Sequence, residues 1–206
     1  DMLFTYAPDG AVTGMVINLA CPSQVTESDH LVSADFWHET RSEIRRRHGE
    51  GLYILPQCSA AGDQSPHLMW KQRAELRMLK LKGLCEDEAG RRMAERAEIG
   101  NRIANAVDEV MPLVAKDTRH EVRLEHVVKT VQLPRRAITE DDVKEAEREA
   151  LSYEEKLAEL ADRPASDSER STCISRARWF RSVIERHELQ KTQPNYPMEL
   201  HVVRVG

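Results

Sequence analysis

Short apolar runs separated by turn and loop sequences open the chain. Residues 3–6 and 12–20 are apolar or β-branched, and a Pro-Asp-Gly turn sequence separates them at 8–10. This pattern predicts a β-hairpin. Residues 14–20 show almost no polar alternation, so we expect the second strand to be buried on both faces.

A helix and another strand are expected next. After a polar loop at 21–33, apolar residues recur at helical spacing, and the helix is predicted to begin at Ser33 or Asp35 and to end at His48-Gly49. Residues 52–55 then form a short apolar run. The order strand, helix, strand indicates a crossover unit in a largely parallel sheet.

The remainder of the chain is dominated by helical patterns. Three segments are rich in Ala, Glu, Arg and Leu and predict helices with solvated faces: residues 89–111, 139–161 and 167–191. Val, Leu and Thr at strand density predict one strand at 121–133, and a final strand is expected at 197–205.

The predicted fold class is therefore α/β, with a mixed, largely parallel sheet, flanking helices and a helical insertion. We expect a single domain fragment in which 1–88 form the sheet core, 89–193 the helix-rich segment and 197–205 the last strand. Both terminal segments read as strands of a sheet, so we expect the chain to be part of a larger domain that is cut at both ends.

Composition excludes two classes of partner. The chain is 32% charged, and no apolar run approaches the roughly 20 residues that span a bilayer, so no transmembrane segment is predicted. A net charge of −5 argues against binding to nucleic acid, which normally requires a clustered basic face. The cysteines lack the close paired spacing of zinc knuckles and redox motifs; they are Cys21, Cys58, Cys85 and Cys173.

The loop at 57–67 is the main candidate for chemistry. It follows a predicted strand and leads into a helix predicted at 66–82. A serine just before proline at a helix start presents its hydroxyl near unpaired backbone amides, which are suitable donors for a developing oxyanion. Ser65 is therefore a candidate nucleophile. The alternative is purely structural: Ser65 caps the helix, Pro66 is its first residue and Asp63 closes an Asx turn.

A second polar loop is expected beside it. The loops at 21–33 and 57–67 both leave the carboxyl ends of predicted parallel strands. Ligands of open α/β sheets gather at such ends. We therefore expect both loops to open on the same edge of the sheet.

Two short motifs lie within the strand, loop, helix and strand described above: Leu31-Val32-Ser33-Ala34-Asp35 and Gly62-Asp63-Gln64-Ser65-Pro66. Together with this order of elements, they resemble the neutral and alkaline ceramidase family. The resemblance covers residues 12–67, with a weaker likeness at 124–135 and 198–206.

The resemblance implies a secreted or periplasmic hydrolase that cleaves an N-acyl amide bond of a small-molecule or lipid substrate at a zinc site. It assigns the nucleophile to Ser65 and the shaping of the loop to Asp63. Gly62, Gln64 and Pro66 would complete the loop beside the substrate. His67, by its position two residues after Ser65, is a candidate base or part of the substrate mouth, and the alternative is a histidine at a helix start that faces water.

One position departs from the family pattern. The family carries a zinc-binding histidine just after the strand that matches residues 16–20, but here Cys21 stands there and the first histidine is His30. Cys21 is a weak candidate ligand, since thiolates bind zinc but a small cysteine at a strand end commonly packs. The resemblance places the remaining ligands outside this chain. The alternative function is therefore a metal-free, non-catalytic homologue that binds lipid or glycan or serves as a structural domain.

Overall fold

The predicted hairpin forms the first part of the fold. In the computed structural model, which describes residues 1–29, 32–161 and 164–206, β1 (Met2–Tyr6) pairs antiparallel with β2 (Val12–Leu19). The amide of Ala7 donates to the Ala11 carbonyl at 2.8 Å across the turn. Gly10 has a φ of 87°, which favours glycine.

The crossover unit is confirmed. Helix α1 (Phe36–His48) begins after Asp35, whose carboxylate accepts from the Phe36 amide, and ends at Gly49 with a φ of 124°. It leads to β3 (Tyr53–Cys58), which pairs in parallel with β2 and completes a sheet of order β1-β2-β3.

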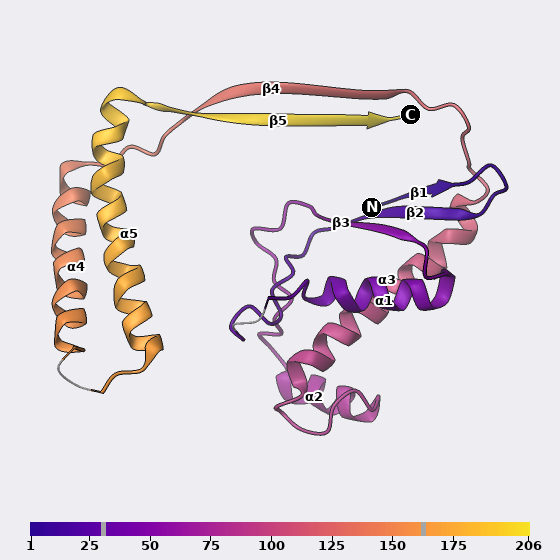
Figure 1. The fold of residues 1–206 in the computed structure, drawn as a ribbon, viewed down its shortest axis with the longest axis horizontal. Helices are drawn as coiled ribbons and strands as arrows, with labels where there is room; N and C mark the ends of the chain where they lie inside the picture. The colour runs from indigo at the N-terminus through magenta and orange to yellow at the C-terminus, as the bar shows by residue number, and fades with distance from the viewer. Residues whose placement is uncertain (30–31, 162–163) are drawn as a thin grey trace. The chain divides into compact units, whose positions relative to one another are not determined.

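The core lies between this sheet and two helices, α1 and α3 (Arg91–Val114), which run along one side of it (Figure 1). Met15 and Ile17 from β2 pack in one cluster with Phe36 and Ile44 from α1 and with Val107 from α3. Helices α1 and α3 approach closely, because a Cβ added at Gly100 would lie only 2.9 Å from the Thr40 amide nitrogen.

The opposite face of the sheet is open. On the strands that flank β2, Leu3, Tyr53 and Leu55 are exposed, with Tyr53 at 81%. In β2 itself, Gly14, Met15 and Ile17 are buried, while Val16 on the open face is only half-buried. Strand β2 is therefore fully buried on the face that the helices cover and only partly buried on the other.

Helix α2 (Gln72–Leu81) is shorter than predicted. Its apolar anchor is Leu79, which is 1% exposed. Lys82, just after it, pairs with Glu98 of α3 at 2.5 Å.

Residues 120–206 form a second compact unit, and the division of the chain falls between Arg119 and His120. We call Asp1–Arg119 unit 1 and His120–Gly206 unit 2. Helix α3, the first helix of the helix-rich segment predicted at 89–193, packs on the sheet core and so belongs to unit 1. The mixed α/β class is confirmed, and the treatment of both units as one domain stays a prediction.

Unit 2 consists of a two-stranded ribbon and a helical hairpin (Figure 1). Strand β4 (Leu124–Pro134) pairs antiparallel with β5 (Asn195–Val205), so the strand predicted at 121–133 exists but belongs to a separate sheet. Between them, α4 (Glu140–Glu159) packs on α5 (Asp167–Thr192). Only β2 and β3 pair in parallel among the described strands.

Small side chains permit the contact between these helices. Ala146 and Ala150 of α4 are buried, as are Cys173 and Ala177 of α5. Both helices start with capping boxes, Thr139 with Asp142 and Ser166 with Glu169. Within the described ranges, no helix is long and apolar enough to cross a bilayer.

The contact of α1 with α3 generates a stability prediction. Gly100→Ala places a methyl group against backbone atoms of Glu39 and Thr40, which cannot move cheaply. We expect the free energy of unfolding to fall by about 1–3 kcal/mol, although alanine favours helix by about 1 kcal/mol. Gly51→Ala is the control because no atom lies within 4 Å of its added Cβ. Urea denaturation measures both, and an unchanged or stabilised G100A variant would contradict the close contact.

Candidate functional site

The loops at 21–33 and 57–67 meet at the carboxyl ends of β2 and β3, as expected. The Ser59 amide donates to the Leu19 carbonyl at 3.0 Å and so continues the pairing of the two strands into the second loop. Farther along, His67 Nε2 lies 3.1 Å from Glu27 Oε1 in the first loop. The candidate nucleophile Ser65 therefore lies two residues from the point at which the second loop contacts the first.

A buried carboxylate fixes the first loop. Asp35 is 5% exposed, and its Oδ2 accepts from both the amide and the hydroxyl of Thr26 at 2.8 Å. Its Oδ1 accepts from the Phe36 amide at 2.9 Å. Burial raises the pKa of Asp35, but hydrogen bonds from Phe36, Thr26 and the Val25 amide outweigh it and hold the pKa below its usual value.

Helix α3 ties the same region down from outside the loop. Arg96, itself buried, donates to the backbone carbonyl of Asp35 at 3.2 Å and pairs with Glu39 at 2.8 Å. Arg92 forms an ion pair with Asp29 in the loop. The described part of the first loop is therefore held by both α1 and α3, while His30 and Leu31 lie outside the described residues.

Ser65 does not cap a helix. Its Oγ accepts a hydrogen bond from the His67 amide, two residues farther along, at 3.1 Å. This bond forms a local serine turn. Lys71, with a φ of 60°, precedes α2, so the predicted start of a helix at Pro66 is wrong. The hydroxyl is exposed, but it lacks the row of helix N-terminal amides that the sequence argument placed beside it.

The residues before Ser65 form a tight turn. The Gln64 amide donates to the Ala61 carbonyl at 3.1 Å, which places Gly62 and Asp63 at the central positions. The backbone closes this turn, rather than the Asp63 side chain as in the predicted Asx turn. Gly62, Asp63 and Gln64 are exposed and Pro66 is half-buried, so the turn presents the motif at the surface of unit 1.

The partner of His67 was missed by the sequence reasoning. Both side chains of the pair are accessible, with Glu27 at 51% and His67 at 40% exposed. A hydrogen bond between Nε2 and Glu27 orients the imidazole and leaves Nδ1 available. The expected meeting of the two loops was a signal that an acidic residue of the first loop would lie near His67.

Cys21 fits the role of a zinc ligand poorly. It is half-buried, and its Sγ lies 3.7 Å from the Pro22 carbonyl oxygen. Burial, together with the charges of Cys58 and Asp35, raises the pKa of the Cys21 thiol and so disfavours the thiolate that binds metal. Within the described ranges, no three His, Cys, Asp or Glu residues gather as a metal site. Zinc therefore stays a prediction.

Comparison with known proteins gave no match among family models, curated proteins or solved structures.

The Asp35 carboxylate generates a pH-dependent prediction. Asp35→Asn replaces one of the two acceptor oxygens with an NH₂ group, so hydrogen bonds from either Thr26 or Phe36 are lost. We expect a loss of about 1–3 kcal/mol in the free energy of unfolding at pH 7. Because the folded pKa lies below the unfolded value of about 3.9, the carboxylate contributes fully above that value. The contribution is lost as pH falls through the folded pKa.

Urea denaturation at pH 7 and pH 3 measures the difference in the free energy of unfolding between the wild type and D35N. This difference should be smaller at pH 3. Asp63→Asn serves as the control because its side chain is exposed. An equal difference at both pH values would show that the charge of Asp35 does not stabilise the loop.

Proposed function

We propose that unit 1 contributes the nucleophile of a hydrolase that cleaves an N-acyl amide bond, with Ser65 in that role. The observation that supports this most directly is the convergence of the two loops at the carboxyl ends of β2 and β3. There an exposed serine lies two residues from a histidine that is paired with a carboxylate. The resemblance of residues 12–67 to the ceramidases supplies the substrate class.

The proposed reaction uses side chains of this chain. Rotation of the Ser65 side chain breaks the hydrogen bond from the His67 backbone amide to Oγ. The Oγ atom then attacks the carbonyl carbon of the substrate's N-acyl amide. His67 takes the hydroxyl proton and later transfers it to the leaving amine, while Glu27 holds the other ring nitrogen. Water then cleaves the acyl ester to release a fatty acid and restore Ser65. Bound zinc would polarise the carbonyl in the resembled family, and no step here is assigned to it.

A non-catalytic lipid- or glycan-binding or structural domain is the second candidate. It is favoured by the hydrogen bonds that the two key side chains already make. Ser65 Oγ accepts from the His67 backbone, and the His67 ring pairs with Glu27, so the nucleophile and its base are not bonded to each other in the described residues. The raised pKa of Cys21 points in the same direction.

Hydrolysis of a fluorescent N-acyl sphingosine tests the first proposal. We expect turnover by the full chain, a loss of at least about 10³-fold in Ser65→Ala, and a loss of about 10²-fold or more in His67→Ala. Ser59→Ala is the matched control, because Ser59 is also exposed but lies at the start of the loop. Parallel reactions with added zinc and with a chelator show whether metal contributes.

Three outcomes separate the candidates. Turnover that depends on Ser65 but not on Ser59 supports the hydrolase. Turnover unaffected by Ser65→Ala contradicts the assigned nucleophile. Binding of the substrate without turnover, by folded protein with and without zinc, supports the non-catalytic domain.

A further inference from the structure

Unit 2 contains a cavity that the proposed hydrolysis does not use. It has a volume of about 510 Å³ and lies where the segment after β4 meets the first turns of α4 and the middle of α5. Ligand sites for small molecules commonly have volumes of roughly 300–1,000 Å³. The cavity is open on one side and large enough to accommodate part of a medium-length hydrocarbon chain.

Part of the lining is apolar. Ile138 precedes α4, and Trp179 and Val183 lie one turn apart on α5. Trp179 is 62% exposed although it is one of the largest apolar side chains of the unit. An indole left in this position has contact area to offer to a hydrocarbon chain.

Three arginines line the same cavity. Arg135 donates through Nε to the Gln193 carbonyl at 2.9 Å, and Arg186 donates through Nε to the Ser182 carbonyl at 3.0 Å. Each keeps terminal nitrogens for another acceptor. Arg136 makes no hydrogen bond or ion pair within the described ranges, although its charge helps to hold the pKa of Asp142 below its usual value. Guanidinium groups match the geometry of carboxylate and phosphate oxygens.

Two carboxylates reduce this positive charge without cancelling it. Asp142 already accepts from the amide and the hydroxyl of Thr139, both at 2.7 Å. Glu145 lies 3.8 Å from Arg148. With three arginines against two acids, the lining keeps a positive charge, and the acids are directed in part to other partners.

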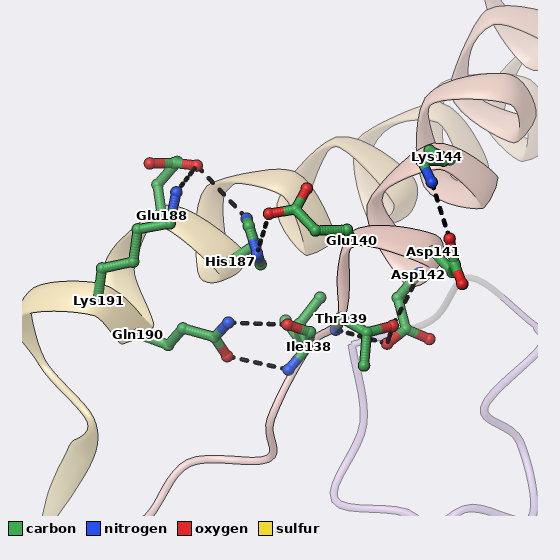
Figure 2. Close-up of polar contacts among 10 residues, drawn as sticks. All are labelled: Ile138, Thr139, Glu140, Asp141, Asp142, Lys144, His187, Glu188, Gln190 and Lys191. Carbon is green, nitrogen blue, oxygen red and sulfur yellow. Dashed lines mark hydrogen bonds and ion pairs between the residues drawn. The ribbon is translucent and has the colours of Figure 1, made fainter.

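The wall of the cavity is held in place. The Gln190 side chain bonds both backbone groups of Ile138, accepting from its amide at 2.9 Å and donating to its carbonyl at 2.8 Å. Figure 2 shows these two hydrogen bonds beside the Thr139–Asp142 cap. It also shows His187 between Glu140 and Glu188. The segment before α4 is thus fixed to α5 before any ligand binds, which reduces the entropic cost of binding.

From this lining we propose that unit 2 binds an anionic amphiphile, a molecule with one carboxylate or similar head group on a hydrocarbon chain. The chain packs against Ile138, Trp179 and Val183, and the head group pairs with Arg136 and Arg186. The ligand is a dissolved monomer rather than a lipid in a bilayer, because the site is a cavity of limited volume. This site is independent of the chemistry proposed for Ser65.

Quenching of tryptophan fluorescence by 11-bromoundecanoate tests the proposal. In the full chain with Trp70→Phe, the remaining indoles are the buried Trp37 and the exposed Trp179. We expect saturable quenching that is lost when Trp179→Phe is added. Arg136→Gln with Arg186→Gln should weaken binding by about tenfold or more. Arg176→Gln with Arg178→Gln is the matched control, since it makes the same charge change on exposed positions of α5 outside the cavity lining.

Several results would overturn the site. One is the absence of saturable quenching in folded protein. A second is displacement of the bromoundecanoate probe by decyltrimethylammonium as effectively as by decanoate. A third is an equal loss of affinity for the probe in the two double arginine variants. Binding only to phosphatidylglycerol vesicles, without quenching by the monomeric probe, would show a surface for membranes instead of a cavity for monomers.

Discussion

The buried carboxylate of Asp35 is the interaction on which the arrangement of unit 1 depends. Asp35 joins three parts of the chain. Its carboxylate oxygens accept from Thr26 in the first loop and from Phe36 at the start of α1. Its backbone carbonyl accepts from Arg96 of α3. The residue has a φ of 51°, which is uncommon outside glycine and is maintained by these bonds. Without this carboxylate, the described part of the loop that carries Glu27 would lose its bonds to Asp35 and keep the ion pair of Arg92 with Asp29.

Much of the fold could be predicted from the sequence because local signals agreed with packing. The first hairpin, the crossover at α1 and the positions of α4 and α5 followed from apolar spacing and composition. The capping boxes at Thr139 and Ser166 agree with these helix starts. The strand near 121–133 was predicted, but its partner was not, because pairing with β5 joins residues far apart in the sequence. A pattern of apolar residues does not specify which sheet a strand enters.

The candidate site was less predictable for a different physical reason. Ser65-Pro66 is equally compatible with a helix cap and with a local serine turn, and the bond from the His67 amide selects the turn. Glu27 became a partner of His67 only through the folding of two loops that are 40 residues apart. The serine was named by the resemblance and the histidine by its place two residues farther along, whereas the polar contacts around them depend on tertiary structure.

The insertion of α4 and α5 between β4 and β5 also bears on the order in which unit 2 folds. Pro134 and Asn195 pair at the helical end of the ribbon, and Leu124 and Val205 pair at the far end. Closing a long loop costs chain entropy, but a preformed hairpin of helices already brings 134 and 195 together. Pairing therefore costs least when it starts beside the helices and proceeds outward one residue pair at a time, so Leu124 and Val205 are the last residues of the ribbon to pair.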